Sequence, residues 1–333
     1  MYRQSDSRSI VKWIRVALSA LILSLCTSSG WAHKTGFDQW LQGVRSDALK
    51  QGISKNTLDQ ALKNISPIAR IIELDRRQTE FTVTFQDYLN RIAAPQSRIN
   101  KGRALLAENR VVLEAVGQRY GVQPRFIVAL WGIESNFGTN TGDFYVIEAL
   151  ATLAFDGRRS SFFRKELMNA LKILDEGHIT VARMKGSWAG AMGQSQFMPS
   201  SFLSRAEDFD GDGRRDIWTT RADVFASAAN YLSKAGWRDD QTWGRAVLLP
   251  ANFNKSLTGT KVKRTLAQWQ KMGVRKTDGS DLPSRDLKGS IVIPKRSGGQ
   301  AFLVYKNFST IKRWNNSTFF ALAVGHLADG IGQ

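Results

Sequence analysis

Cysteine is nearly missing from this sequence, since Cys26 is the only one in 333 residues. It lies in an N-terminal segment that we expect to be removed, so the mature chain would have no disulfide and no cysteine chemistry. A long apolar run is missing too, because the stretch Val16 to Leu25 is too short to be a comfortable membrane span. No long low-complexity tract and no internal repeat is evident.

That apolar stretch forms part of a leader. Basic residues precede it, and Gly30-Trp31-Ala32 ends the small and polar segment that follows. This order is typical of a secretory signal peptide. We therefore predict a signal peptide over residues 1–32, cleaved near Ala32, and a periplasmic protein. The alternatives are a short membrane anchor or a lipid on Cys26, although Leu25 is a poor neighbour for lipid attachment.

Acidic residues are also scarce, with 29 of them against 47 lysines and arginines, which gives a formal net charge of +18. Without the leader the net charge is about +15. Such a charge attracts polyanions. Nucleic acid is one candidate, but the leader and the absence of a recognised nucleic-acid motif favour an anionic envelope instead. With 42% hydrophobic and 23% charged residues, the chain is globular in composition.

Helical patterns dominate most of the chain. From Asp38 to about Gly117 apolar residues recur at helical spacing, and Ser54 suits a helix start. Pro124 opens the segment 126–133, which is apolar on every side and therefore predicts a buried helix. Further helices are expected over residues 145–155, 162–174, 222–235 and 318–327, and a structured loop over residues 186–201.

The pattern changes between about Trp243 and Tyr305. Short strand-like runs begin at Val247, Ser290 and Ala301 and are bounded by Gly, Pro or Asn. We interpret residues 243–305 as a small β-containing insertion in a mainly α (α+β) protein. The helical core and an α domain would take up about residues 36–242 and 306–333, within one functional region over residues 33–333.

Glu134 ends the buried apolar helix, just before a turn in which Gly138 suits a helix stop. A carboxylate at this place loses hydration, which favours the protonated form and raises its pKa. Such an acid can protonate a leaving oxygen near neutral pH. The alternative is a glutamate on the one solvent-facing side of its helix. The turn favours the catalytic interpretation, because it places Glu134 at the end of the helix and not in the middle of a solvent-facing surface.

The segment from residue 186 to residue 201 is a second candidate. Three glycines within eight residues let its backbone bend sharply and approach a ligand closely. Ser187 and Gln196 offer hydrogen bonds to hydroxyls and amides, and Phe197 offers an apolar face. Composition alone favours a structural loop at this place.

One short acidic segment also stands out. Asp208, Asp210 and Asp212 alternate, and Gly213 takes the sixth position, as in an EF-hand calcium loop. The twelfth position is Thr219 instead of the bidentate glutamate, so the match is incomplete. A structural calcium site is our hypothesis, and a solvated acidic turn is the alternative.

Together, Glu134 with Gly138, the stretch Ala189 to Ser201, the Asp208 loop and Tyr231 resemble the lytic murein transglycosylase B family. The likeness runs from about residue 36 to the C-terminus, and the long Gly-rich stretch is highly specific. The resemblance implies a lysozyme-like helical core with an α domain and a β domain around it. It also implies that peptidoglycan glycan strands are the binding partner and that catalysis needs no cofactor. We expect a monomer that associates with the envelope.

The activity that the resemblance implies is cleavage of the β-1,4 bond between N-acetylmuramic acid and N-acetylglucosamine. The muramyl C6 hydroxyl attacks its own C1 in place of water, which leaves a 1,6-anhydro end. Glu134 matches the family's catalytic glutamate, so it would first protonate the glycosidic oxygen and then take the proton of the C6 hydroxyl. The substrate's N-acetyl group can assist departure, so a second carboxylate is not needed.

The resemblance also implies a set of substrate contacts. Ser187 would bind the N-acetyl group in the cleaved subsite. Arg158 and Arg159 would meet peptide-stem or lactyl carboxylates, because guanidinium forks suit carboxylates; a solvated basic turn is the alternative for them. The remaining cleft positions are Gln196, Phe197, Tyr231, Asn315 and Tyr88.

Other family positions concern calcium and two substitutions. The closing calcium ligand matches Asp223, and Arg214 would contribute its backbone carbonyl. The chain has Trp314 before Asn315 where the family has tyrosine, and Phe320 where tyrosine is common. Both keep an aromatic ring but change or lose the hydroxyl.

Two other functions are compatible with this chain. A hydrolase of the goose-lysozyme kind would need a second, water-activating carboxylate, for which Asp143 and Asp156 are the nearest candidates in sequence. A non-catalytic peptidoglycan-binding protein is the other, and the intact Glu134 argues against it. The product decides between them, because a hydrolase leaves reducing ends and a binding protein leaves the strands uncut.

Overall fold

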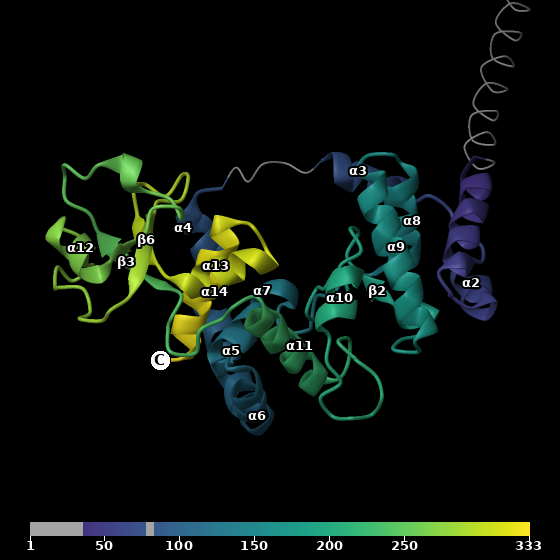
Figure 1. Ribbon diagram of the computed structural model, residues 1–333, viewed down its shortest axis with the longest axis horizontal. Helices are drawn as coiled ribbons and strands as arrows, with labels where there is room; N and C mark the ends of the chain where they lie inside the picture. The colour runs from purple at the N-terminus through teal and green to yellow at the C-terminus, as the bar shows by residue number, and fades with distance from the viewer. Residues whose placement is uncertain (1–35, 78–82) are drawn as a thin grey trace, which may run out of the picture.

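Three groups of elements follow one another across the molecule, as Figure 1 shows: an outer helical layer, a central helical bundle and a small sheet. The computed structural model describes residues 36–77 and 83–333, so the predicted leader with Cys26 lies outside the described residues. Within these two ranges, no helix combines the length and the apolar character needed to cross a membrane.

The outer layer packs around an apolar core of its own. It begins with a helix over residues 36–50. Ser54 then caps the next helix, because its hydroxyl accepts a hydrogen bond from the N–H of Thr57 at 3.2 Å. Other helices of this layer are α2 (Lys55–Ala61), α3 (Ala69–Arg76), α8 (Val146–Phe155), α9 (Ser160–Asp175) and α10 (Pro199–Arg205).

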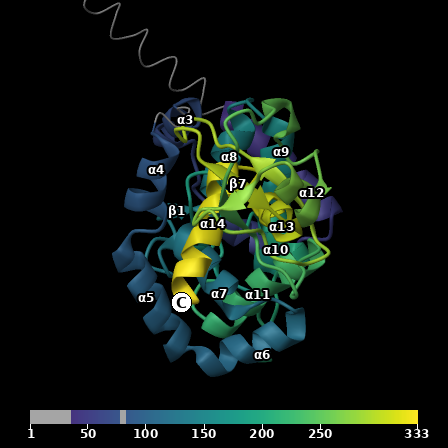
Figure 2. The same ribbon diagram turned by 90° about the vertical axis from the view of Figure 1, so that its left-hand side faces the viewer.

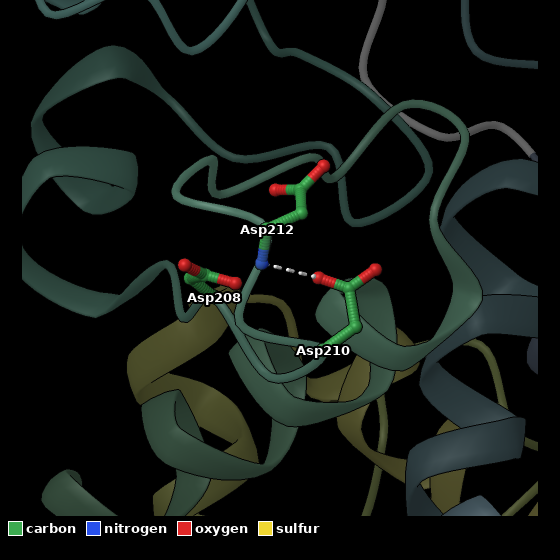
Figure 3. Close-up of side chains that lie close together, drawn as sticks. All are labelled: Asp208, Asp210 and Asp212. Carbon is green, nitrogen blue, oxygen red and sulfur yellow. Dashed lines mark hydrogen bonds between the residues drawn. The ribbon is translucent and has the colours of Figure 1, made fainter.

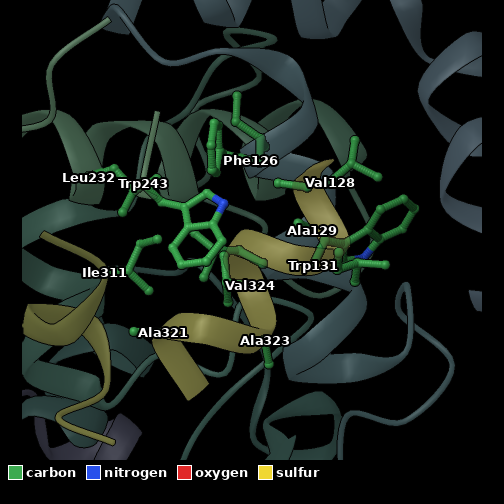
Figure 4. Packing of buried hydrophobic residues seen from close by; sticks show 14 of the residues in the cluster. Phe126, Val128, Ala129, Trp131, Leu232, Trp243, Ile311, Ala321, Ala323 and Val324 are labelled. Atoms are coloured by element: carbon green, nitrogen blue, oxygen red, sulfur yellow. The ribbon is translucent and has the colours of Figure 1, made fainter. Parts of the chain in front are cut away.

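The central bundle surrounds α7 (Pro124–Ser135), whose apolar residues are buried on nearly every side. The helix α14 (Thr318–Ile331) packs along it, and Figure 2 shows α5 and α6 around their lower edge. Figure 4 shows side chains of both helices in one cluster with Trp243. A Cβ on Gly325 would lie 2.3 Å from the Trp243 ring, so this packing requires a residue without a side chain.

The other elements of the bundle connect or cover these two helices. They are α4 (Phe85–Asp87), the π-helix η1 (Tyr88–Ala93), α5 (Gln96–Glu108), α6 (Arg110–Tyr120), α11 (Arg221–Lys234) and α13 (Lys306–Trp314). Because nearly all apolar residues of α7 are buried among these elements, packing against the bundle sets the position of its C-terminal end.

The sheet is antiparallel throughout, with strand order β4-β6-β7-β3-β5. Its strands are β3 (Gly244–Leu248), β4 (Arg264–Thr265), β5 (Arg275–Lys276), β6 (Lys288–Val292) and β7 (Ala301–Val304), and α12 (Leu266–Lys271) covers one face. Trp269 of α12 is fully buried, and its indole N–H donates to the carbonyl of Gly289 at 2.9 Å. This contact ties the helix to the sheet.

The mainly α architecture with a small sheet confirms the predicted fold class. The helix from Pro124, the helices near 145–155, 162–174, 222–235 and 318–327, and the three strand-like runs are all present. Two details differ. The stretch 186–201, predicted as a loop, includes the start of α10, because Pro199 is well suited to a first helical position. The helix α13 was not predicted.

Candidate active site

Glu134 lies in the last turn of α7, as predicted. The helix then stops abruptly, since Asn136, Phe137 and Gly138 all have left-handed backbone angles, with φ of 50°, 60° and 79°. A Cβ on Gly138 would lie 2.3 Å from Oε1 of Gln194, so only glycine allows this close approach. The turn therefore joins the helix end to the Gly-rich segment.

The Gly-rich loop, residues 187–198, follows β2 (Lys185–Gly186), which pairs with β1 (Phe144–Tyr145). Gln194 anchors this loop to the bundle. Its Oε1 accepts a hydrogen bond from the indole N–H of Trp131 in α7 at 2.8 Å, and its Nε2 donates to the carbonyl of Trp218 at 2.8 Å. The loop is thereby fixed beside the turn of α7 that carries Glu134.

The Glu134 side chain lines a narrow pocket together with Gln194, Ser195 and Trp314. Burial raises the pKa of its carboxyl to about 7, because the charged form loses hydration there. The indole N–H of Trp314 donates to Oε1 of Glu134 at 2.6 Å and acts in the opposite direction, since it stabilises the carboxylate. A carboxyl with this pKa is about half protonated at neutral pH.

An aromatic wall, formed by Trp314, Tyr231 and Phe197, stands beside this carboxyl. The Trp314 ring centroid lies 4.7 Å from that of Tyr231 and 5.1 Å from that of Phe197. The Tyr231 hydroxyl donates to the carbonyl of Arg313 at 2.7 Å. Phe197 is only 2% exposed, so it supports the other two rings and does not present a broad face of its own.

The structure brings other predicted contacts into this neighbourhood. Tyr88 of η1 lies close enough for the charge of Glu134 to raise its pKa, in addition to burial. Asn315 directly follows Trp314 and is exposed, and its Oδ1 accepts a hydrogen bond from the N–H of Ser317 at 3.0 Å. Phe320 is buried in the bundle core at 7% exposure.

Ser187 and Gln196 lie in the Gly-rich loop and are half-buried. The Ser187 hydroxyl accepts a hydrogen bond from the N–H of Ala191 at 3.0 Å. Gln196 has a left-handed φ of 49°, and its Nε2 donates to the carbonyls of Thr141 at 2.9 Å and Gly193 at 2.8 Å. Both side chains therefore help to hold the loop in shape.

Arg158 and Arg159 precede α9 and share one carboxylate, that of Asp75 in α3. Asp75 is 1% exposed, whereas the two guanidinium side chains are 49% and 43% exposed. Arg158 also donates to the Asp75 carbonyl at 2.5 Å. The buried aspartate thus holds a pair of arginines that solvent still reaches.

The acidic loop brings carboxylate oxygens of Asp208, Asp210 and Asp212 within 4.8 Å of one another, as drawn in Figure 3. Asp208 accepts hydrogen bonds from Gly211 at 2.8 Å and Gly213 at 2.9 Å, which closes the turn. Oxygen donors in this arrangement are the ligands that calcium prefers.

Asp223 lies beneath this loop and is fully buried. Its two oxygens accept hydrogen bonds from the N–H groups of Phe209 at 2.8 Å and Asp216 at 2.7 Å. Arg214 points its guanidinium at Asp212, with Nη2 2.7 Å from Oδ2. Asp223 therefore shapes the backbone that carries the half-buried Asp208 and the exposed Asp210 and Asp212.

Neither of the two candidates for the water-activating carboxylate of a hydrolase, Asp143 and Asp156, lines the pocket that contains Glu134. Asp156 forms an ion pair with Arg76 at 2.8 Å, and Asp143 lies exposed before β1. A larger hollow of about 530 Å³ lies between α5, α6 and the end of α14, but its carboxylate, Glu114, is paired with Arg110. Neither Asp156 nor Glu114 has the dehydrated setting that raises the pKa of Glu134.

Sequence reasoning missed three supporting residues. Asp75 gives no signal in the sequence, because its partners follow more than eighty residues later. Gln194 has no distinguishing signal among the polar residues of its loop, because its bonds to Trp131 and Trp218 join separate segments. Trp314 was noted as a departure from a family pattern, but its bond to Glu134 depends on two positions 180 residues apart.

Comparison with known proteins gives matches over most of the chain. The family profile described as "Transglycosylase SLT domain" matches residues 36–329. The chain is 30% identical to the membrane-bound lytic murein transglycosylase B of Escherichia coli (strain K12) over 293 residues, which is 85% of this chain and 79% of that protein.

Two solved structures are also similar. SltB3 from Pseudomonas aeruginosa, in complex with NAG-NAM-pentapeptide, has a TM-score of 0.86 and 45% sequence identity, over 89% of this chain and 79% of that one. The Escherichia coli lytic transglycosylase SLT35, in complex with calcium, has a TM-score of 0.74 and 27% identity, over 90% and 93% of the two chains.

Proposed function

The chain belongs to the transglycosylase SLT domain family, and on this premise we propose that it cuts peptidoglycan glycan strands with Glu134 as its single acid and base. The bond cut is the β-1,4 link between N-acetylmuramic acid and N-acetylglucosamine, and the product carries a 1,6-anhydromuramyl end. The observation that carries this proposal is a carboxyl with a pKa of about 7 at a helix end, beside a Gly-rich loop and an aromatic wall.

The first step requires the protonated form of Glu134. The carboxyl gives its proton to the glycosidic oxygen while the C1–O bond breaks and the electron pair goes to the leaving sugar. A pKa near the working pH suits this task, because the protonated form is populated and the proton is still transferred easily. The N-acetyl group of the same ring assists departure, so no second carboxylate and no cofactor take part.

The second step requires the carboxylate that the first step leaves. It accepts the proton of the muramyl C6 hydroxyl while that oxygen forms a bond to C1. Glu134 returns to its protonated state, and water contributes no atom. The ion pair of Asp156 with Arg76 supports this route over hydrolysis, because it occupies one of the two carboxylates that could activate a water.

We assign the substrate contacts to two groups of residues. The Gly-rich loop with Ser187, Gln196 and Phe197, together with Tyr231, Asn315 and Tyr88, would line the glycan cleft. Arg158 and Arg159, held by Asp75, would meet carboxylates of the peptide stem or lactyl group. Their half-exposed guanidinium groups are oriented in advance by the buried aspartate, which lowers the entropy lost on binding.

We assign the acidic loop to calcium with a structural role. Carboxylates of Asp208, Asp210 and Asp212 would be ligands, joined by the Arg214 carbonyl and by Asp223 as the closing residue. The SLT35 structure similar to this chain contains calcium. We place the mature protein in the periplasm, on the basis of the leader and of the envelope enzymes that this chain is similar to.

Activity measurements with Glu134→Gln test the acid and base role. The amide keeps the size of the side chain and an oxygen that can accept the Trp314 hydrogen bond, but its N–H groups are not acidic enough to protonate a leaving oxygen. We expect release of muropeptides from purified peptidoglycan to fall by about 10²–10⁴-fold, the usual contribution of a general acid and base. Retained activity in this variant, with a circular dichroism spectrum like that of the wild type, would exclude Glu134 as the catalytic residue.

A further inference from the structure

The hydrogen bond between Trp314 and Glu134 has a fixed direction. An indole nitrogen donates one hydrogen and can neither accept nor pass on a proton. The Nε1–H of Trp314 donates to Oε1 of Glu134 at 2.6 Å, which is at the short end for a hydrogen bond to a carboxyl oxygen. Oε1 must therefore act as an acceptor whether Glu134 is protonated or ionised.

The indole ring is held from several sides. It packs against Phe197 of the Gly-rich loop and Tyr231 of α11, with ring centroids 5.1 Å and 4.7 Å away. The Tyr231 hydroxyl is bonded to the carbonyl of the neighbouring Arg313. Trp314 also packs against both the central core and the core of the outer layer. These contacts fix the ring and aim its N–H at the carboxyl.

We propose that Trp314 is a positioning residue, which keeps Oε1 of Glu134 as an acceptor and leaves Oε2 as the oxygen that gives and recovers the catalytic proton. In a neutral carboxyl the carbonyl oxygen is the better acceptor, so the N–H of Trp314 directs the proton to the other oxygen. This inference rests on the proposed function, in which Glu134 is acid and base in turn. The transferred proton leaves Oε2 for the glycosidic oxygen, and the C6 hydroxyl supplies the proton that replaces it.

The same bond sets how readily Glu134 ionises. Burial raises the pKa of its carboxyl, and the N–H of Trp314 opposes that rise. Tyr88 on η1 is close enough to interact with the charge of Glu134, and Arg98 on α5 interacts with Tyr88 in the same way. Burial raises the pKa of the Tyr88 phenol from its usual 10.0, so the phenol stays neutral near pH 7. Burial lowers the pKa of the Arg98 guanidinium, but a guanidinium remains charged in proteins at this pH. Tyr231, beyond the indole, also has a raised pKa and stays neutral.

The substitution Trp314→Phe tests this role, since it keeps an aromatic ring and deletes the N–H. We expect the titration midpoint of Glu134, followed by NMR of isotope-labelled glutamate carboxyls in the full chain, to rise by about one pH unit. The Glu134 signal is the one that is missing in Glu134→Gln. The alkaline limb of the kcat/KM profile should move to higher pH by the same amount, and kcat should fall about tenfold as the carboxyl loses its orientation.

Trp243→Phe is the matched control. The indole N–H of Trp243 also donates to a carboxylate, Asp329 at 2.8 Å, but it lies in the central core. This variant loses an equivalent hydrogen bond and should melt at a lower temperature. It should leave the Glu134 midpoint and the alkaline limb in place, which separates positioning of the catalytic carboxyl from general stability.

An unmoved midpoint in Trp314→Phe would overturn the inference. If that variant does not fold, the wild type decides: the indole N–H signal of Trp314 should titrate together with Glu134 and should stop titrating in Glu134→Gln. The inference is also overturned if no indole N–H signal titrates together with Glu134. Failure of the proposed function would give a different result from failure of this inference. The wild type would release no anhydromuramyl ends, although the titration midpoint of Glu134 would still move in Trp314→Phe.

Discussion

Replacing Glu134 by glutamine should stabilise this protein above neutral pH, even though the same change should greatly lower its activity. The carboxyl has a pKa of about 7 in the folded chain, against 4.5 for an ordinary glutamate. Below pH 4.5 both folded and unfolded chains hold the proton, so the carboxyl imposes no penalty. As the pH rises from 4.5 to 7, the unfolded chain ionises and the folded chain does not. Stability is therefore lost across this window, and the loss is complete above the folded pKa.

The size of this penalty follows from the two pKa values. Each unit of difference corresponds to about 1.4 kcal/mol, so the folded state loses about 3 kcal/mol above pH 7. Glutamine does not ionise and escapes this loss. The unfolding free energy of Glu134→Gln minus that of the wild type should therefore grow by about 3 kcal/mol from acidic to alkaline pH. The corresponding rise in melting temperature is roughly 6 °C.

Urea unfolding of both proteins at about pH 4 and about pH 9 measures this difference. Glu114→Gln, on the exposed face of α6, serves as the control, and its difference from the wild type should change by less than about 0.5 kcal/mol between the two conditions. Effects of other carboxyl groups cancel, because wild type and variant share them. A difference between Glu134→Gln and wild type that stays constant or shrinks with pH would refute the account of Glu134 as a buried, proton-holding acid.

Three other outcomes follow from the same structure. The kcat/KM of the wild type should fall about tenfold per pH unit above about 7, since the protonated form of Glu134 starts the reaction; a flat profile to alkaline pH contradicts this. Asp75→Asn should lower the unfolding free energy by about 1–3 kcal/mol, and it should raise KM more for peptide-bearing glycan than for bare glycan. Equal increases in KM for the two substrates would show that Arg158 and Arg159 do not bind the stem peptide. A calcium chelator should lower the melting temperature of the wild type but not that of the double variant Asp208→Asn, Asp210→Asn, and identical melting curves with and without chelator would argue against the metal site.

The helices and strands follow well from the sequence because their signals are local. Residues 126–133 are apolar on every side, and a helix of that kind is stable only when it is surrounded. The strand-like runs near Val247, Ser290 and Ala301 likewise correspond to β3, β6 and β7. The two-residue strands β4 and β5 were not predicted, because their pairing partners and not their own residues define them.

The place of Glu134 at the end of a buried helix, and the loss of hydration there, could be predicted from its own segment. Its partners could not. The bond from Trp314 and the sharing of Asp75 by two arginines join residues far apart in the chain, and the sequence carries no periodic signal for such contacts. The amphipathic helix α13 carries Trp314 and packs its apolar face against the central bundle. Its pattern is short and lies between the strand-like run at Ala301 and the strongly apolar helix over residues 318–327.

Digestion of purified peptidoglycan in water enriched in heavy oxygen tests the central claim most directly. In this account, Glu134 removes the proton of the C6 hydroxyl, and the C6 oxygen then attacks C1 of the same sugar. Every new muramyl end is therefore an anhydro ring that carries no oxygen from the solvent. Mass spectrometry of the released fragments should show only such unlabelled ends. New reducing ends that carry the heavy isotope would mean that water is the nucleophile, and the account given for this site would be wrong.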